Sequence, residues 1–368
     1  MHLSQITPSI FSCLGLSTAN DEIKAGDSPM GREILFLIDG LGADVLDTYA
    51  SQMPSISRLT THAMVNTGFP STTSTSLTTL TTGALPGVHG MLGYTVQVPR
   101  SGGRILNALK WDERVDPLHW QPVPTLFERA VAEGIQVSHV AAKRYENSGF
   151  TRAAFRGAQY RGANLASDLI AQTKEALKNT PSFAYLYVND LDVAGHSDGV
   201  GSDKWLAALA MIDQLLANLM RQMPQGTRIW LTSDHGMINV GEKIVIGSGN
   251  PLLENVAVIA GEPRARHLYL APGYDSPAAR SDVARVWAQY LGERAHVFTR
   301  EEALDNNLFG DLVSPDSIDR MGEVIAVAQG NAILIDPARV EKEGAMVGHH
   351  GADSSIESQV ALLTTTLQ

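Results

Sequence analysis

Three short apolar runs, each closely followed by an aspartate, constrain the fold of this chain more than any other feature. The runs occupy residues 34–38, 183–188 and 228–231, and none of them alternates with polar residues. Runs of this length without alternation are typical of strands that are covered on both faces of a parallel sheet. Apolar residues at helical spacing fill the segments between them, at 125–131 and 203–222. We therefore predict an α/β fold with a doubly wound, mostly parallel sheet flanked by helices.

A change of pattern predicts a second unit at residues 262–340. Short strand-like runs at 266–270 and 295–298 flank a helical segment near 276–291 there. We expect a small α+β insertion that caps or flanks the main sheet. Residues 1–261 and 341–368 would then form the α/β core, which ends in a last strand at 359–363.

The charge balance excludes several classes of partner. The 368 residues carry 28 basic and 39 acidic side chains, a formal net charge of −11. A nucleic-acid duplex or an anionic membrane surface needs a basic partner, so we expect neither. No apolar run approaches the roughly 18 residues needed to span a bilayer. The sequence indicates no particular oligomeric state.

The only cysteine, Cys13, rules out an intramolecular disulfide and a cysteine-rich zinc module. It lies in an apolar stretch, residues 8–15, that resembles the core of a weak signal peptide. No Lys or Arg precedes Lys24, so the basic region of such a signal is missing. We read the stretch as a short helix and predict a cytoplasmic protein.

Acidic and histidine residues follow the predicted strands where each of them ends. Asp39 follows the first run, Asp192 and His196 the second, and Asp234 with His235 the third. The carboxyl ends of parallel strands meet at one edge of a sheet, where ligands collect. Each residue alone has a simpler explanation, since an Asp after a strand commonly caps a helix or forms a turn. Together they would place costly like charges at one edge, and metal ions would neutralise them.

The Gly348-His349-His350-Gly351 segment adds imidazoles just before the last predicted strand. Mixed Asp and His ligands without thiolate suit zinc, and manganese is the alternative. Six such ligands are too many for one four-coordinate ion. The sequence therefore predicts two divalent ions, with coordination positions left open, as in two-metal phosphoryl-transfer sites.

A hydroxyl-rich patch at residues 71–82 offers a nucleophile. It follows a predicted strand and opens a predicted helix, where free amide groups favour an anion. A hydroxyl there is a poor nucleophile unless a metal or a base lowers its pKa. The alternative is that these Ser and Thr residues only cap the helix.

From Ile34 to Asp353 these motifs resemble the alkaline phosphatase superfamily, and within it the type I phosphodiesterase and nucleotide pyrophosphatase family. The motifs occur in the order of that family, and the Phe-Pro, Thr and Thr-Gly spacing around the nucleophile is kept without a gap. The matching segments are Leu37-Ile38-Asp39-Gly40, Phe69-Pro70 with Thr73 and Thr82-Gly83, Pro86-Gly87-Val88-His89-Gly90, Asp192-Val193-Ala194-Gly195-His196, Ser233-Asp234-His235-Gly236-Met237, and His350-Gly351 with Asp353.

The resemblance implies an alkaline-phosphatase-like core and a role for each matched residue. Thr73 would be the catalytic nucleophile. One ion would be held by Asp192, His196 and His350, and the other by Asp39, Asp234 and His235, with Thr73 in contact with the second ion.

Three further residues are placed by the same comparison. The alignment favours His350 over its neighbour His349 as the ligand, and His89 is expected to support the loop after the nucleophile helix. The family has an Asn three residues after the nucleophile that contacts a phosphoryl oxygen. Here this residue is Ser76, which we expect to bind substrate although its hydroxyl reaches less far than an amide.

The implied function is two-metal hydrolysis of a phosphoester through a covalent phosphothreonine intermediate, on a small phosphate ester or nucleotide. A diester or a nucleotide pyrophosphate bond is the expected target. The alternatives on the same core are a phosphomonoesterase, a phosphonate hydrolase and a non-catalytic metal-binding relative. A monoesterase would need an added cation at the site, and Lys143, Arg144 and Arg152 are the candidates.

Overall fold

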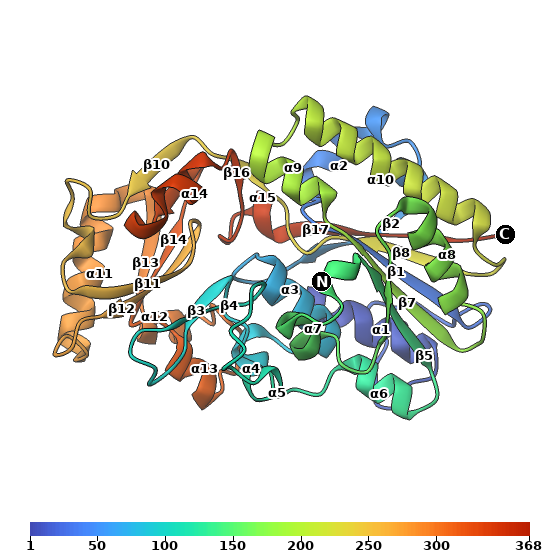
Figure 1. Cartoon of the computed structure of the whole chain (residues 1–368), viewed down its shortest axis with the longest axis horizontal. Coiled ribbons are helices and arrows are strands. Elements are labelled where there is room, and N and C mark those ends of the chain that lie inside the picture. The colour runs from blue at the N-terminus through green and yellow to red at the C-terminus, as the bar shows by residue number, and fades with distance from the viewer.

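The computed structural model describes all 368 residues and contains a seven-stranded main sheet (Figure 1). The strand order is β2-β17-β8-β1-β7-β5-β6. All strands run in one direction except β17, which is antiparallel to both of its neighbours, so the predicted mostly parallel sheet is confirmed. The strands are β1 (Arg32–Ile38), β2 (Thr60–Asn66), β5 (Gln136–Ala141), β6 (Gln159–Gly162), β7 (Ser182–Val188), β8 (Arg228–Thr232) and β17 (Gln359–Thr366).

Helices cover both faces of this sheet, as a doubly wound fold requires (Figure 1). Side chains of β1 alternate between two hydrophobic cores, because successive residues of a strand point to opposite faces. Leu35 and Leu37 lie in one core, whereas Ile34, Phe36 and Ile38 lie in the other. The first core is closed by α1 (Ile6–Cys13), α3 (Thr73–Thr82), α6 (Leu126–Ala132) and α7 (Gly149–Ala154), and the second by α2 (Asp44–Thr48), α8 (Ala166–Ala176), α9 (Asp190–Asp198) and α10 (Asp203–Gln222).

A second, four-stranded sheet lies at the other end of the molecule (Figure 1). Its order is β11-β12-β14-β13, antiparallel throughout, with β11 (Val256–Glu262), β12 (Ala265–Leu270), β13 (Ala295–Thr299) and β14 (Val324–Ala328). Helix α11 (Pro277–Leu291) packs on one face, and side chains of the other face join the first core of the main sheet.

The predicted insertion at 262–340 contains three of these four strands. Strand β11 begins at Val256, six residues before the predicted boundary. It reaches further because it completes the antiparallel pair with β12, and its first three residues are not buried, so they give a weak signal in the sequence. The division of the chain into two domains stays a prediction.

The remaining elements are short connections. Pairs form between β3 and β4, between β10 and β15, and between β9 and β16. The short strands are β3 (Thr95–Gln97), β4 (Ile105–Asn107), β9 (Ile238–Asn239), β10 (Glu242–Val245), β15 (Ala332–Ile335) and β16 (Gly348–His349). The short helices are α4 (Pro86–His89), α5 (Pro117–Trp120), α12 (Arg300–Asp305), α13 (Pro315–Arg320), α14 (Val340–Ala345) and α15 (Ser355–Ser358), with 3-10 turns at η1 (Leu3–Gln5), η2 (Ala50–Gln52), η3 (Ile56–Arg58), η4 (Lys143–Tyr145), η5 (Pro251–Leu253), η6 (Gly292–Arg294) and η7 (Pro337–Arg339).

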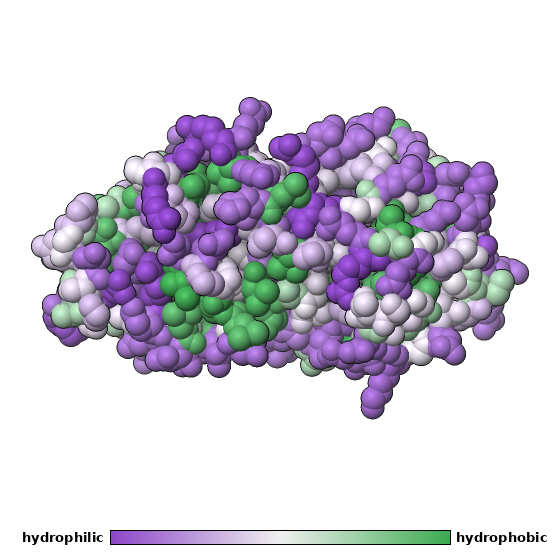
Figure 2. All heavy atoms as spheres, turned by 90° about the horizontal axis from the view of Figure 1, so that it is seen from below, coloured by the Kyte–Doolittle hydropathy of each residue, from purple (hydrophilic) through white to green (hydrophobic).

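The surface is mainly hydrophilic on the face that Figure 2 shows, and its most extended hydrophobic area lies in the half of the molecule that holds the second sheet. None of the helices combines the length with the apolar character that crossing a membrane requires.

Candidate active site

The main strands end together and bring their aspartates to one edge. Ile38 of β1 is level with Val188 of β7, and the Asp39 amide donates to the Val188 carbonyl at 3.0 Å. From the other neighbouring strand, Asp234 accepts the Gly40 amide through Oδ1 at 3.2 Å. The parallel register therefore converts three distant segments into one cluster, as the sequence predicted.

Two glycines permit the close approach of the loops that carry these residues. Gly40 has φ +79°, and a β-carbon there would lie 3.2 Å from the Asp192 Cα. A β-carbon on Gly236 would lie 2.0 Å from the Ile356 carbonyl oxygen. Any larger residue would push the loop after β1 away from α9, or the loop after β8 away from α15.

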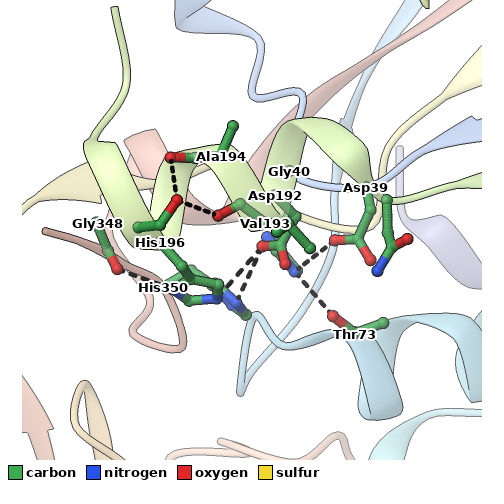
Figure 3. Close-up of polar contacts among 12 residues, drawn as sticks. Asp39, Gly40, Thr73, Asp192, Val193, Ala194, His196, Gly348 and His350 are labelled. Atoms are coloured by element: carbon green, nitrogen blue, oxygen red, sulfur yellow. Dashed lines mark hydrogen bonds and ion pairs between the residues drawn. The ribbon is translucent and has the colours of Figure 1, made fainter. Parts of the chain in front are cut away.

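Helix α9 presents Asp192 and His196 on one face, because residues four apart in a helix are neighbours. The His196 Nε2 lies 3.4 Å from Asp192 Oδ1, and the His350 Nε2 lies 3.6 Å from the same oxygen. The ring of His350 stacks on that of His235 with centroids 3.5 Å apart. Figure 3 shows Asp39, Asp192 and His350 directed toward a common centre beside Thr73.

The three imidazoles are oriented in the same way by the backbone. Each Nδ1 lies within hydrogen-bond distance of a carbonyl oxygen: His196 of Gly348 at 2.8 Å, His235 of Gly236 at 3.0 Å, and His350 of Ser71 at 2.8 Å. A carbonyl only accepts, so each Nδ1 carries the proton and each Nε2 keeps its lone pair. Imidazoles held in this tautomer can bind a metal ion through the unprotonated Nε2.

The facing carboxylates lack the partners that buried charges need. One oxygen of each, Asp39 Oδ1, Asp192 Oδ1 and Asp234 Oδ2, accepts no hydrogen bond. Burial, then the neighbouring carboxylates, raises the pKa of Asp39 well above its ordinary value, and burial also raises the pKa of Asp234. Burial and the adjacent His235 ring lower the pKa of His350, which keeps that ring neutral.

Carboxylate oxygens without a hydrogen-bond partner and unprotonated imidazole nitrogens are suited to bind divalent cations. The ligand atoms form two groups, and within each group they all lie within 4.8 Å of one another. One group is Asp39, Asp234 and His235, and the other is Asp192, His235 and His350. The first is the predicted set. In the second, His235 takes the place predicted for His196, which adjoins the group through Asp192.

Thr73 is the first residue of α3 and is 8% exposed. Its Oγ1 lies 3.2 Å from His235 Nε2, so the predicted nucleophile stands beside both ligand groups. The Tyr187 hydroxyl donates to Asp39 Oδ2. The sequence reasoning missed Tyr187, since a tyrosine inside an apolar strand gives no signal of its own.

Two cavities meet at Thr73. The first, of about 210 Å³, is here called the polar cavity, and its lining includes His196, His349, His350, Arg339 and Lys342. The second, of about 100 Å³, is the aromatic cavity, and its lining includes Asp39, Tyr145, Phe150, Phe155 and Tyr187. Thr73, Leu109 and Asp192 line both.

Other predicted residues do not line these cavities, although Arg144 donates to two residues that line the aromatic cavity, Tyr145 and Asn189. Ser76 is fully buried, its hydroxyl has no hydrogen-bond partner, and it lines neither cavity, so its contact with substrate stays a prediction. Lys143, Arg144 and Arg152 also line neither cavity. The cations that do are Arg339 and Lys342, which the sequence reasoning missed.

His89 supports the loop after α3, as expected. The Met91 amide donates to His89 Nδ1 at 3.2 Å, so the proton sits on Nε2, which bonds the Thr79 hydroxyl at 3.0 Å. Burial lowers the pKa of His89 to about 3, so the ring stays neutral in this role.

Known proteins share this fold. Murine ectonucleotide pyrophosphatase / phosphodiesterase 5 superposes with a TM-score of 0.70 at 17% identity, covering 90% of this chain and 87% of that one. Phosphonoacetate hydrolase from Sinorhizobium meliloti 1021, in complex with phosphonoformate, gives 0.69 at 20% identity, covering 92% and 90%. At these identities the likeness shows the fold alone, and it confirms the predicted alkaline-phosphatase-like architecture.

Sequence relatives agree with the motifs. A venom phosphodiesterase of Naja atra is 27% identical over 227 residues, covering 55% of this chain and 26% of that protein. Ectonucleotide pyrophosphatase/phosphodiesterase family member 1 of Mus musculus is 27% identical over 259 residues, covering 63% and 27%. The chain thus spans about a quarter of the length of these relatives. The family model for type I phosphodiesterase / nucleotide pyrophosphatase matches residues 34–353, and the chain belongs to this family.

Proposed function

We propose that this chain is a two-metal phosphodiesterase or nucleotide pyrophosphatase that acts through Thr73. The observation that carries the proposal is the position of Thr73 at the junction of two cavities, beside the carboxylate and imidazole cluster. The phosphorus of a diester or phosphoanhydride bears two substituents, and each needs a place. A monoester would fill only one of the two cavities.

The ligand groups would hold two divalent ions. Asp39, Asp234 and His235 would hold the ion next to Thr73, and Asp192 and His350 the other, with His196 beside it. Their mix of carboxylate and imidazole suits zinc, with manganese as the alternative. When bound, such ions lower the pKa of a coordinated hydroxyl and offset the charge that develops on phosphate oxygens.

The proposed reaction has two steps, and both take place at Thr73. Thr73 Oγ1 loses its proton to solvent and forms a bond to phosphorus, while the bond to the leaving oxygen breaks and that oxygen takes the electron pair. Water then forms a bond to phosphorus and gives up a proton, the bond between phosphorus and Thr73 Oγ1 breaks, and Oγ1 takes up a proton as the second product leaves. Tyr187, by donating to Asp39, holds that carboxylate in place through both steps.

The aromatic cavity supports a nucleotide as substrate. Its flat walls include Tyr145 and Tyr187, with ring centroids 6.2 Å apart, and a heterocyclic base can stack in such surroundings. The structure of a related murine protein, in an inactive form, was solved in complex with AMP. A phosphomonoesterase, a phosphonate hydrolase and a metal-binding relative without activity are the alternatives.

Activity on matched substrates tests the proposal. Purified protein supplied with zinc should hydrolyse bis(p-nitrophenyl) phosphate faster than p-nitrophenyl phosphate. Thr73→Ala should lower turnover by about 10³-fold or more, while bound zinc stays at two per chain. Thr73→Ser keeps a hydroxyl and should retain measurable turnover. Equal activity of the alanine variant would remove Thr73 from the mechanism, and faster monoester cleavage would favour the phosphomonoesterase.

A further inference from the structure

The polar cavity contains cations that the chemistry at Thr73 does not use. Arg339 comes from η7 and Lys342 from α14, and both line the cavity that also contains Thr73, His196 and His350. Since the chain carries a net charge of −11, two cations at the mouth of one cavity are a notable concentration of positive charge.

Lys342 has no charged partner in the chain, and Arg339 has one, Asp336, with which it makes no hydrogen bond. Lys342 forms no ion pair or hydrogen bond, and its ammonium lies 5.9 Å from the centroid of the Tyr94 ring. The Nε of Arg339 lies 3.6 Å from Asp336 Oδ2, which is too long for a hydrogen bond. Both side chains therefore have donors free to meet a ligand.

The carboxyl groups of the same cavity do not cancel this charge. Glu343 is paired with Arg266. Burial raises the pKa of Glu262 to about 8, so this group is uncharged at neutral pH. Asp192 belongs to the metal-ligand cluster. The outer part of the cavity is thus positive where a substrate would extend from Thr73.

We propose that Lys342 and Arg339 select substrates whose leaving group carries a further anionic group beyond the bond that breaks. This inference rests on the proposed function. The aromatic cavity has no cation in its lining and suits the nucleoside half, which stays on the phosphorus attacked by Thr73. The polar cavity then receives the departing half. A nucleoside triphosphate, which releases pyrophosphate, has this chemistry, whereas an ester that releases an uncharged phenol does not.

A pair of substrates with the same nucleotide half separates this role from general catalysis. ATP has an anionic leaving group, and the p-nitrophenyl ester of AMP has an aromatic one. Lys342→Ala and Arg339→Ala should each lower kcat/KM for ATP about tenfold, the loss expected for one charged hydrogen bond. The p-nitrophenyl ester should change less than twofold.

Conservative and remote variants serve as controls. Lys342→Arg and Arg339→Lys keep the charge and should restore most of the activity on ATP. Arg285→Ala removes a cation from the solvent face of α11, outside both cavities, and should leave both substrates unchanged.

Binding gives a readout that does not depend on turnover. In the Thr73→Ala background, calorimetry should show that Lys342→Ala weakens ATP about tenfold and leaves AMP unchanged. Equal losses on both nucleotides, or unchanged kinetics on ATP, would overturn this inference while the proposed function stands. A parent protein that cleaves neither ATP nor the p-nitrophenyl ester of AMP would overturn the proposed function and this inference with it.

Discussion

Two groups of buried carboxylates in this molecule have different partners. Where the second sheet meets the main core, Arg264 donates to both oxygens of Glu357 at 3.0 and 2.6 Å, and both side chains are fully buried. At the strand ends, Asp39, Asp192 and Asp234 are near histidines only, and no lysine or arginine pairs with them.

The difference separates structure from function. A buried carboxylate that meets an arginine of its own chain is neutralised on folding, and it joins two parts of the fold. A buried carboxylate without such a cation keeps the free-energy cost of its desolvation, and a metal ion bound from outside the chain would offset that cost. Two classes of buried acid can therefore be distinguished by their partners, and each predicts a different result when it is changed.

The largest effect is expected from the strand-end cluster. Asp234→Asn should lower hydrolysis by about 10³-fold or more and reduce bound metal, because it removes one charge from the ligand set. Burial raises the pKa of Asp234, so the metal-free variant should be as stable as the parent or more so. Metal analysis, kinetics and urea unfolding of the metal-free proteins would measure the three quantities.

Asp213→Asn is the matched control, since Asp213 Oδ1 accepts the Ser55 and Ile56 amides at 2.8 Å on the second face of the sheet. It should keep metal and activity and lose about 1 kcal/mol of stability. A metal-free Asp234→Asn protein that is clearly less stable than the parent would contradict the distinction.

The next effect belongs to the paired region and should appear in stability. Arg264→Met leaves Glu357 buried without its cation and should lower the free energy of unfolding by about 3–5 kcal/mol. Bound metal and activity per folded molecule should not change. Adding Glu357→Gln should recover part of the loss. If Arg264→Met loses bound metal but keeps its stability, the pair of Arg264 and Glu357 serves the active site and not the fold.

An acid with neither a metal nor an arginine sharpens the comparison. Glu262 Oε2 accepts the Tyr94 amide at 2.9 Å and Oε1 has no partner. Burial raises the pKa of Glu262 from 4.5 to about 8. The folded state thus holds a proton that the unfolded state releases above pH 4.5. This contribution to stability is complete below that pH and is lost as the pH rises toward 8.

Glu262→Gln carries no titrating group and provides the test. From pH 5 to 8, the stability of the parent should fall relative to the variant by up to about 1.4 kcal/mol per pH unit. Urea unfolding across this range measures the difference. Parallel curves for the two proteins would mean that Glu262 is already ionised in the folded state.

The smallest effect should come from charges that water already solvates. Arg285 and Asp282 form a pair at 2.8 Å on α11, with side chains 66% and 69% exposed. Arg285→Ala should change the free energy of unfolding by no more than about 0.5 kcal/mol, because water and salt screen the pair. A larger change in Tm would show that exposure alone does not separate weak pairs from strong ones here.

Much of the site could be predicted from the residues. Asp39 and Asp234 follow apolar runs, and the spacing of Asp192 and His196 matches a helical turn, so local pattern located them. Arg339 and Lys342 had no such signal. They stand far along the chain from Thr73, in a short turn and helix of ordinary composition, and only the folded chain brings them to the same cavity.

The limits of the fold prediction have a similar origin. Strand β17 was expected, but its antiparallel direction depends on how the chain returns from the second sheet. The early start of β11 at Val256 depends on pairing with β12. The resemblance assigned His235 to one ion only. In the structure it also belongs to the second ligand group, because its ring stacks on that of His350.

The amino-acid sequence by itself determined which segments become buried strands, which side chains follow them, and that these side chains are carboxylates and imidazoles, the kinds that bind metals. Those properties depend on residues near one another in the chain, through apolar periodicity and the chemistry of each side chain. Tertiary structure alone decided which imidazole meets which carboxylate, and that two cavities of different character open at Thr73. These depend on how distant segments pack, and packing is a property of the whole fold.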